Sequence, residues 1–171
     1  MTGWKQADYD KRRGLVKSAD NDWYYGCASM TGITNEIEVM ITSVLDNLDI
    51  IQKLTDCVTA FMKFDEEIAH WVGMAIREAV TNAIQHGNRL DPMKKVEVCY
   101  GMTPECLTVF VRDQGCGFHA DKIPNPLEGD NLLKPSGRGI FYMRTFMDEV
   151  DFRTMPTGGT EVYMVKILQR I

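Results

Sequence analysis

Apolar side chains recur with two different periods along the chain, and the two periods predict its strands and helices. Alternation of apolar and polar residues predicts a strand over 36–44, with Ile37, Val39 and Ile41 on one face. Steps of three and four residues predict an amphipathic helix over 45–64. Its apolar face would consist of Leu48, Ile51, Leu54, Val58 and Phe61.

A second helix is predicted from Asp65 to Gly87. Asp65 is a suitable N-cap, and the two glutamates that follow it lie where the helix dipole favours negative charge. Gly87 is typical of a helix end. The apolar face would consist of Ile68, Val72, Ala75, Ala79 and Ala83. Because most of these side chains are small, we expect the helix to pack closely against a sheet.

The second half of the chain predicts four more strands, one helix and a long loop. The strands are expected over 94–101, 105–113, 150–154 and 160–168, and the helix over 139–150. Residues 119–138 contain three prolines and read as a loop, and loops of that length are usually functional lids or disordered. The order of elements predicts an α+β fold, a two-layer sandwich with helices on one face of a mixed, mainly antiparallel sheet.

Composition adds limits to this outline. Residues 1–34 lack a clear period, so we expect a loosely held N-terminal extension before a domain of residues 35–171. The net charge of −5 argues against a nucleic-acid binder. Five cysteines without a C-x-x-C pair favour free thiols, and no signal peptide or apolar span is evident. We therefore expect a soluble, cytoplasmic protein.

Three polar side chains stand four residues apart on the second helix: Glu78, Asn82 and His86. Such spacing places them on one face, beside the apolar stripe. Asn82 offers a neutral oxygen that suits Mg²⁺, and Glu78 could deprotonate an attacking hydroxyl or water. From the helix alone, an exposed side-chain pair with a capping histidine is the favoured interpretation.

Three glycine motifs follow the helix. Asp113 begins D-x-G-x-G, which continues through Gly115 and Gly117, and its carboxylate could accept a hydrogen bond from an exocyclic amine such as that of adenine. Residues 136–139, SGRG, precede the predicted third helix, so their N–H groups and Arg138 could bind phosphate. Residues 158–160, GGT, favour a hairpin turn, from which Thr160 could reach a purine. Singly, each is also explained as an ordinary turn or hinge.

Together, in this order, the motifs E-x-x-x-N, D-x-G-x-G, G-x-G and G-T resemble the Bergerat-fold ATP site of the GHKL superfamily, which includes type II topoisomerases and histidine kinases. The segments EAVTNAIQHGN, VRDQGCGF, GRGIFYMRTFMDEV and GTEVYMVK are similar to the anti-sigma factor serine kinases of bacterial partner-switching systems. The resemblance spans roughly Ile37 to Leu168.

The resemblance implies a serine/threonine-protein kinase that uses ATP and Mg²⁺. In it Glu78 would be the catalytic base and Asn82 the metal ligand. The nucleotide would be contacted by Asp113, Gly115, Gly117, Gly137, Arg138, Gly139 and Thr160, under a lid of residues 119–136. His86 would be a structural support that joins its helix to the following loop.

The resemblance also implies partners. Members bind a sigma factor in one state, and in the other bind and phosphorylate an anti-anti-sigma protein of the STAS fold. A homodimer is expected, with residues 37–41 and the first helix as the candidate surface. No direct contact with nucleic acid or membrane is implied.

Three other functions use the same kind of pocket. A nucleotide-controlled binding switch without phosphoryl transfer needs no further residue, so the sequence does not separate it from a kinase. The catalytic domain of a histidine kinase needs an accepting histidine on a dimerising helix, and neither His70 nor His119 is placed for that role. A topoisomerase-type ATPase needs a transducer domain, for which we expect no room in 171 residues.

Overall fold

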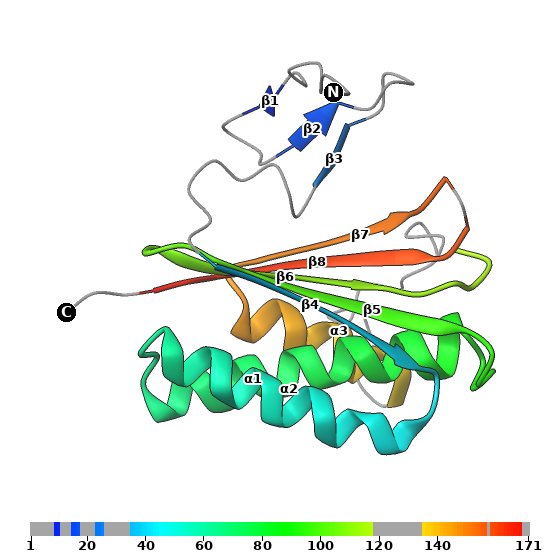
Figure 1. The fold of residues 1–171 in the computed structure, drawn as a ribbon, viewed down its shortest axis with the longest axis horizontal. Helices are drawn as coiled ribbons and strands as arrows, with labels where there is room; N and C mark the ends of the chain where they lie inside the picture. The colour runs from blue at the N-terminus through cyan, green and yellow to red at the C-terminus, as the bar shows by residue number, and fades with distance from the viewer. Residues whose placement is uncertain are drawn as a thin grey trace, which may run out of the picture.

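A five-stranded sheet and three helices form the body of the protein (Figure 1). The computed structural model describes residues 9–10, 15–17, 23–25, 35–117, 135–156 and 158–168, with the backbone alone before residue 35 and for 135–138. The strands are β4 (Asn35–Thr42), β5 (Lys95–Met102), β6 (Cys106–Arg112), β7 (Glu149–Thr154) and β8 (Thr160–Ile167). Their order is β4-β5-β6-β8-β7, and each neighbouring pair is antiparallel.

The helices cover one face of this sheet (Figure 1). They are α1 (Leu48–Phe61), which follows a 3₁₀ turn at Leu45–Asn47, α2 (Glu66–Asn82) and α3 (Pro135–Phe146). The α2 axis continues into a π-helical turn, η3 (Ala83–Gly87). The predicted two-layer α+β fold is confirmed, and the sheet is antiparallel throughout its described pairs instead of mixed.

Before residue 35 the chain forms three short strands that the sequence did not predict. They are β1 (Tyr9–Asp10), β2 (Leu15–Lys17) and β3 (Trp23–Tyr25), which pair as a separate antiparallel sheet. Strands of two or three residues are too short to show an alternating period. The division of the chain at residue 34 stays a prediction.

The small apolar residues of α2 allow it to lie close to the sheet, as predicted. Val72, Ala75 and Ala79 are fully buried beneath the inner side chains of β5, β6 and β8. Asp65 caps the helix, since its Oδ1 accepts the Ile68 N–H at 2.8 Å. A second contact fixes α3 beside α2, because Trp71 stacks on Phe146 with ring centroids 4.2 Å apart.

Two predicted helices differ from the structure at their ends. Phe61, expected in the core, is 64% exposed, because α1 ends there and Met62 takes the buried place before Lys63 turns the chain at positive φ. The third helix begins at Pro135, not at 139, since proline is well suited to a first helical position. It ends at Phe146, because the next residues pair with β8.

Two further observations concern the chain as a whole. In the part that the structure describes, no helix is long and apolar enough to cross a membrane. The thiols of Cys57, Cys99, Cys106 and Cys116 are free.

Asn88 joins four segments at one end of the sheet. This residue is fully buried, and its Nδ2 donates to Ser43 Oγ at 2.7 Å and to Lys95 O at 2.8 Å. Its Oδ1 accepts the Gln114 N–H at 2.7 Å. One amide therefore connects the chain after η3 to the ends of β4 and β6 and the start of β5.

We expect Asn88→Ala to destabilise the protein by about 2–4 kcal/mol, because it removes three buried or partly buried hydrogen bonds of about 1 kcal/mol each. Urea unfolding monitored by circular dichroism measures the change. Gln85→Ala, which truncates an exposed amide of η3, is the matched control and should have little effect. A loss for Asn88→Ala no larger than that of the control would contradict the bridging role.

Candidate functional site

Asp113 is the residue on which two of the predicted turns converge. It is 8% exposed and follows directly after β6. Its Oδ1 accepts the Gly115 N–H at 2.8 Å and the Thr160 N–H at 3.1 Å. The Asp113 N–H in turn donates to Thr160 O at 3.0 Å. The D-x-G-x-G and G-G-T motifs, almost 50 residues apart in the sequence, therefore form one structure.

Glycines surround this carboxylate because no side chain would fit. A Cβ atom at Gly87 would overlap the Asp113 carboxyl group, one at Gly115 would overlap Gly87 O, and one at Gly159 would overlap Asp113 O. Gly87 is therefore required by close packing. The helical segment ends at Gly87, as predicted. The left-handed conformation that often follows a helix is adopted by Arg89 and Leu90 and not by Gly87.

Three glycines of these motifs allow the backbone to turn at positive φ. Gly117, Gly158 and Gly159 have φ values of 84°, 87° and 90°, which favour glycine. Gly158 and Gly159 form the predicted tight connection between β7 and β8, with the Met155 N–H donating to Gly159 O at 3.0 Å.

Burial disfavours the ionised form of the Asp113 carboxyl group. Burial raises the pKa of its carboxyl group above the ordinary value. The N–H groups of Gly115 and Thr160, the Thr160 side chain and the positive charge of Lys94 all oppose that shift. A carboxylate in such a site gains from any further hydrogen-bond donor, such as an exocyclic amine.

Glu78 and Asn82 lie half-buried on the last turns of α2. A Cβ atom at Gly139 would overlap the Glu78 carboxylate, so α3 passes directly against it. The side chains of Glu78 and Asn82 make no hydrogen bond or ion pair with any residue that the structure describes. The predicted helix motif and the G-x-G motif are thus brought together, and two polar groups remain available to a ligand.

The SGRG segment lies within α3 instead of before it, because the helix begins at Pro135. The first turn of a helix has N–H groups without partners in the helix, here those of Ser136, Gly137 and Arg138. The candidate phosphate donors are therefore the N–H groups of residues 136–138, without that of Gly139. Gly139 instead leaves space for the Glu78 carboxylate. Of the predicted lid, residues 119–134 lie outside the described residues, and 135 and 136 belong to the helix.

The η3 turn separates the two groups of site residues. In it the Asn88 N–H donates to Ala83 O, five residues earlier, at 2.8 Å. Such π-helical turns occur often at functional sites. The His86 imidazole is exposed and makes no hydrogen bond with the described residues, so the support expected from His86 comes from Asn88. In the sequence, Asn88 with Asp91 and Pro92 is typical of a loop.

Comparison with known proteins agrees with this geometry. Residues 41–166 match the model of the histidine kinase-like ATPase domain. The anti-sigma F factor of Oceanobacillus iheyensis is 30% identical over 139 residues, which cover 80% of this chain and 94% of that protein. The serine-protein kinase RsbW of Bacillus licheniformis is 30% identical over 140 residues, which cover 78% of this chain and 86% of that protein.

The fold is also found in a solved structure. That of the RsbU and RsbW domains of a Mycobacterium tuberculosis protein superimposes with a TM-score of 0.58 at 15% identity, covering 80% of this chain and 34% of the other. On the family match and the 30% identity to nearly full-length relatives, the chain belongs to the histidine kinase-like (GHKL) ATPase family and is related to the RsbW and anti-sigma F kinases.

Proposed function

We propose that this protein is an ATP- and Mg²⁺-dependent serine/threonine-protein kinase that acts as an anti-sigma factor in the cytoplasm. The observation that carries the proposal is the arrangement along α2 and η3. Glu78 meets the glycine motif of α3, and Gly87, about 13 Å further along the axis, meets Asp113. A purine at Asp113 and a triphosphate at the start of α3 can therefore occupy one extended site.

The residues at the purine end suit adenine. Asp113 would accept the exocyclic amine, and its carboxylate is already oriented by Gly115 and Thr160. The absence of side chains at Gly87, Gly115 and Gly159 lets backbone approach it closely. Gly117 would line the same pocket, and Thr160 would lie near the base.

The residues at the phosphate end suit a magnesium nucleotide. Asn82 offers an amide oxygen that has no partner among the described residues, and Mg²⁺ accepts such a ligand together with phosphates and water. When bound, the ion would offset the negative charge of the phosphates. The free N–H groups of Ser136, Gly137 and Arg138 would orient the phosphates at the positive end of α3.

Glu78 would act as the general base. Its carboxylate has no competing partner among the described residues and lies at the helix that would hold the phosphates. It would accept the proton of the serine or threonine hydroxyl as the hydroxyl oxygen attacks the γ-phosphorus in line with the departing ADP.

The protein substrate would be a STAS-type anti-anti-sigma protein, and a sigma factor would be the alternative partner. This follows from the names of the relatives, an anti-sigma F factor and the RsbW serine-protein kinases. A homodimer would use β4 and α1, as the sequence suggested. β4 is an edge strand, and Met40, Ile50 and Phe61 nearby are more than half exposed.

A groove beside β4 supports the use of this edge by a second protein. It measures about 320 Å³. It is lined by Asn35, Glu36, Ile37, Cys57, Val58, Phe61 and Met102. An apolar groove along an open sheet edge suits either a second copy or a partner.

A binding switch that transfers no phosphate is the second candidate, since it needs the same nucleotide site. Incubation of the protein with γ-labelled ATP and a STAS-domain protein separates the two. Label on a serine or threonine of the partner supports the kinase, and ATP-dependent complex formation without label supports the switch.

Asn82→Ala should abolish ATP binding in the presence of Mg²⁺, because it removes the proposed metal ligand. Isothermal titration calorimetry with and without Mg²⁺ measures the ATP affinity. When the metal is chelated, the variant and the unchanged protein should bind ATP alike. Gln85→Ala, the loss of an exposed amide one turn later, is the control. Unchanged Mg²⁺-dependent affinity in Asn82→Ala would rule out this ligand.

Glu78→Gln should leave ATP affinity intact and slow phosphoryl transfer by about 10²- to 10⁴-fold, the usual contribution of a general base. The rate of label transfer to the partner is the measurement. Glu67→Gln, at an exposed position in the first turn of the same helix, should transfer at the rate of the unchanged protein. Normal transfer by Glu78→Gln would show that another group takes the proton.

Asp113→Asn should weaken ATP binding and also change how stability depends on pH. The folded protein binds the Asp113 proton more tightly than the unfolded chain, because burial raises the pKa. The resulting stabilisation is complete below the ordinary pKa of aspartate, about 3.9, and is lost as the pH rises through the raised value.

The free energy of unfolding of the unchanged protein minus that of Asp113→Asn should therefore fall over that range and then level off. Urea unfolding at a series of pH values measures this difference. Asparagine keeps an acceptor oxygen for Gly115 and Thr160 but does not ionise. A difference that is independent of pH would show that the Asp113 pKa is not raised.

A further inference from the structure

The face of the main sheet opposite the helices has an apolar centre that is shielded from solvent. Cys99, Phe110 and Tyr163 are neighbours across β5, β6 and β8, and their side chains point away from the helices. Their exposed fractions are only 1%, 1% and 4%. The Phe110 and Tyr163 rings lie 5.1 Å apart. Large aromatic side chains on an open sheet face would be partly wet, so another layer covers this face.

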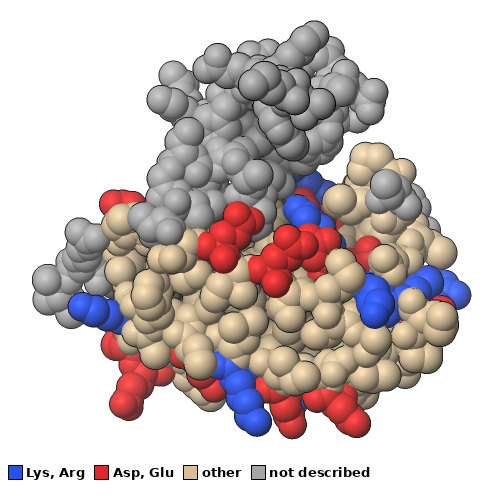
Figure 2. All heavy atoms as spheres, viewed as in Figure 1, with Lys and Arg blue, Asp and Glu red and all other residues tan. Residues whose placement is uncertain are grey.

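Acidic side chains surround this centre. Figure 2 shows red side chains gathered at the upper part of the described surface, on the sheet side of the molecule. From the strand register, this face carries Glu36, Glu38, Glu97, Glu149, Asp151 and Glu161 against Lys95, Arg112 and Arg153. Negative charge is therefore in excess.

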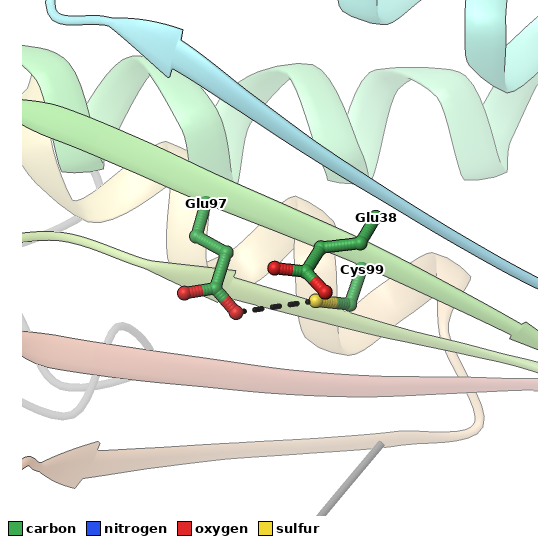
Figure 3. Close-up of side chains that lie close together, drawn as sticks. All are labelled: Glu38, Glu97 and Cys99. Carbon is green, nitrogen blue, oxygen red and sulfur yellow. Dashed lines mark hydrogen bonds between the residues drawn. The ribbon is translucent and has the colours of Figure 1, made fainter. Parts of the chain in front are cut away.

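The charge excess is greatest around Arg112. Its Nε and Nη1 donate to Glu161 Oε2 and Glu97 Oε1, each at 2.6 Å. Glu38 and Glu97 converge on Cys99, whose Sγ donates to Glu97 Oε1 at 3.3 Å (Figure 3). Glu161 is buried, and its Oε1 has no hydrogen-bond partner among the residues that the structure describes. One arginine thus serves two carboxylates, with a third nearby, so a cationic cover would be favoured.

We propose that the small sheet β1–β3 of the same chain forms the third layer, over this face. Figure 1 draws β1–β3 on the side of the main sheet that faces away from the helices. Three strands of two or three residues cannot bury a core of their own and need a surface to lie on. Sheets stacked face to face lie about 10 Å apart, which fits two separate sheets without shared hydrogen bonds.

The composition of the small sheet suits the surface beneath it. β2 and β3 read LVK and WYY, an apolar and aromatic composition that would suit a centre made of Phe110 and Tyr163. Lys11, Arg12 and Arg13 stand between β1 and β2 in the sequence, and Lys17 ends β2. These cations match the acidic surroundings of the centre. This layer would leave the β4 edge as the open surface for a partner.

Zero-length carbodiimide cross-linking of the full chain tests where the small sheet lies. Amide bonds should form between Lys11 or Lys17 and carboxylates of this face, and peptide mass spectrometry identifies them. The ion pair of Lys166 with Asp148, 3.3 Å apart, is an internal positive control. The proposal would be overturned if the control cross-link forms and no cross-link joins Lys11 or Lys17 to this face.

An equal mixture of ¹⁵N-labelled and unlabelled chains identifies the occupant. Cross-links from Lys11 or Lys17 confined to one isotope mean that each chain covers its own sheet, as proposed. Mixed-isotope cross-links would mean that a second copy supplies the cover, and would overturn it.

Thiol labelling gives an independent readout. In a full chain that keeps Cys99 alone, with the other four cysteines changed to serine, Cys99 should react slowly with a maleimide. The double variant Trp23→Ala, Tyr25→Ala should raise the rate by at least about tenfold, which corresponds to about 1.4 kcal/mol of lost shielding. Tyr142→Ala, on the exposed side of α3, is the control. An unchanged labelling rate in the double variant would contradict the proposed cover.

Discussion

The close approach of Gly87 to Asp113 is the constraint on which the site depends. It fixes the end of the α2–η3 helix against the end of β6, and the Asp113 carboxylate fills the space that a side chain at Gly87 would occupy. The same carboxylate holds the turns after β6 and before β8 through two N–H groups. Asn88 then holds the neighbouring ends of β4, β5 and β6 through its side-chain amide. Helix, hairpin and loop are therefore positioned by two buried polar side chains next to one glycine.

The opposite end of the helix is positioned by packing instead of hydrogen bonds. Trp71 stacks on Phe146, and Gly139 allows α3 to lie against Glu78. The two ends of the site are thus held by different means, a rigid polar network at Asp113 and an apolar helix contact at Glu78. This difference suits the proposed kinase, in which the purine end would select a base and the phosphate end would admit a second protein.

Much of this could be predicted from the sequence, for reasons that particular residues make clear. The period of Val72, Ala75 and Ala79 identified the buried face of α2, and the Asp65 cap marked its start. The start of α3 was placed too late, because the glycines at 137 and 139 obscured the helix that Pro135 begins.

Two side chains behaved differently from what the spacing suggested. His86 follows Asn82 by four residues, but η3 widens the turn between them and leaves the imidazole exposed. Asn88 has no periodic signal at all, since its role comes from contacts with residues 45 positions before it and 26 after it. Local pattern predicts which residues share a helix face, and it does not reveal contacts between distant parts of the chain.

The π-helical turn has a consequence for how this segment can change. Gln85 and His86 are exposed and can vary in identity. Loss of either residue would close η3 into an ordinary α-turn and rotate everything after it by about 100° around the helix axis. Gly87 would then point away from Asp113, and Asn88 would leave its pocket. In this segment the number of residues is under stricter control than their chemistry, so related sequences should tolerate substitutions here but not insertions or deletions.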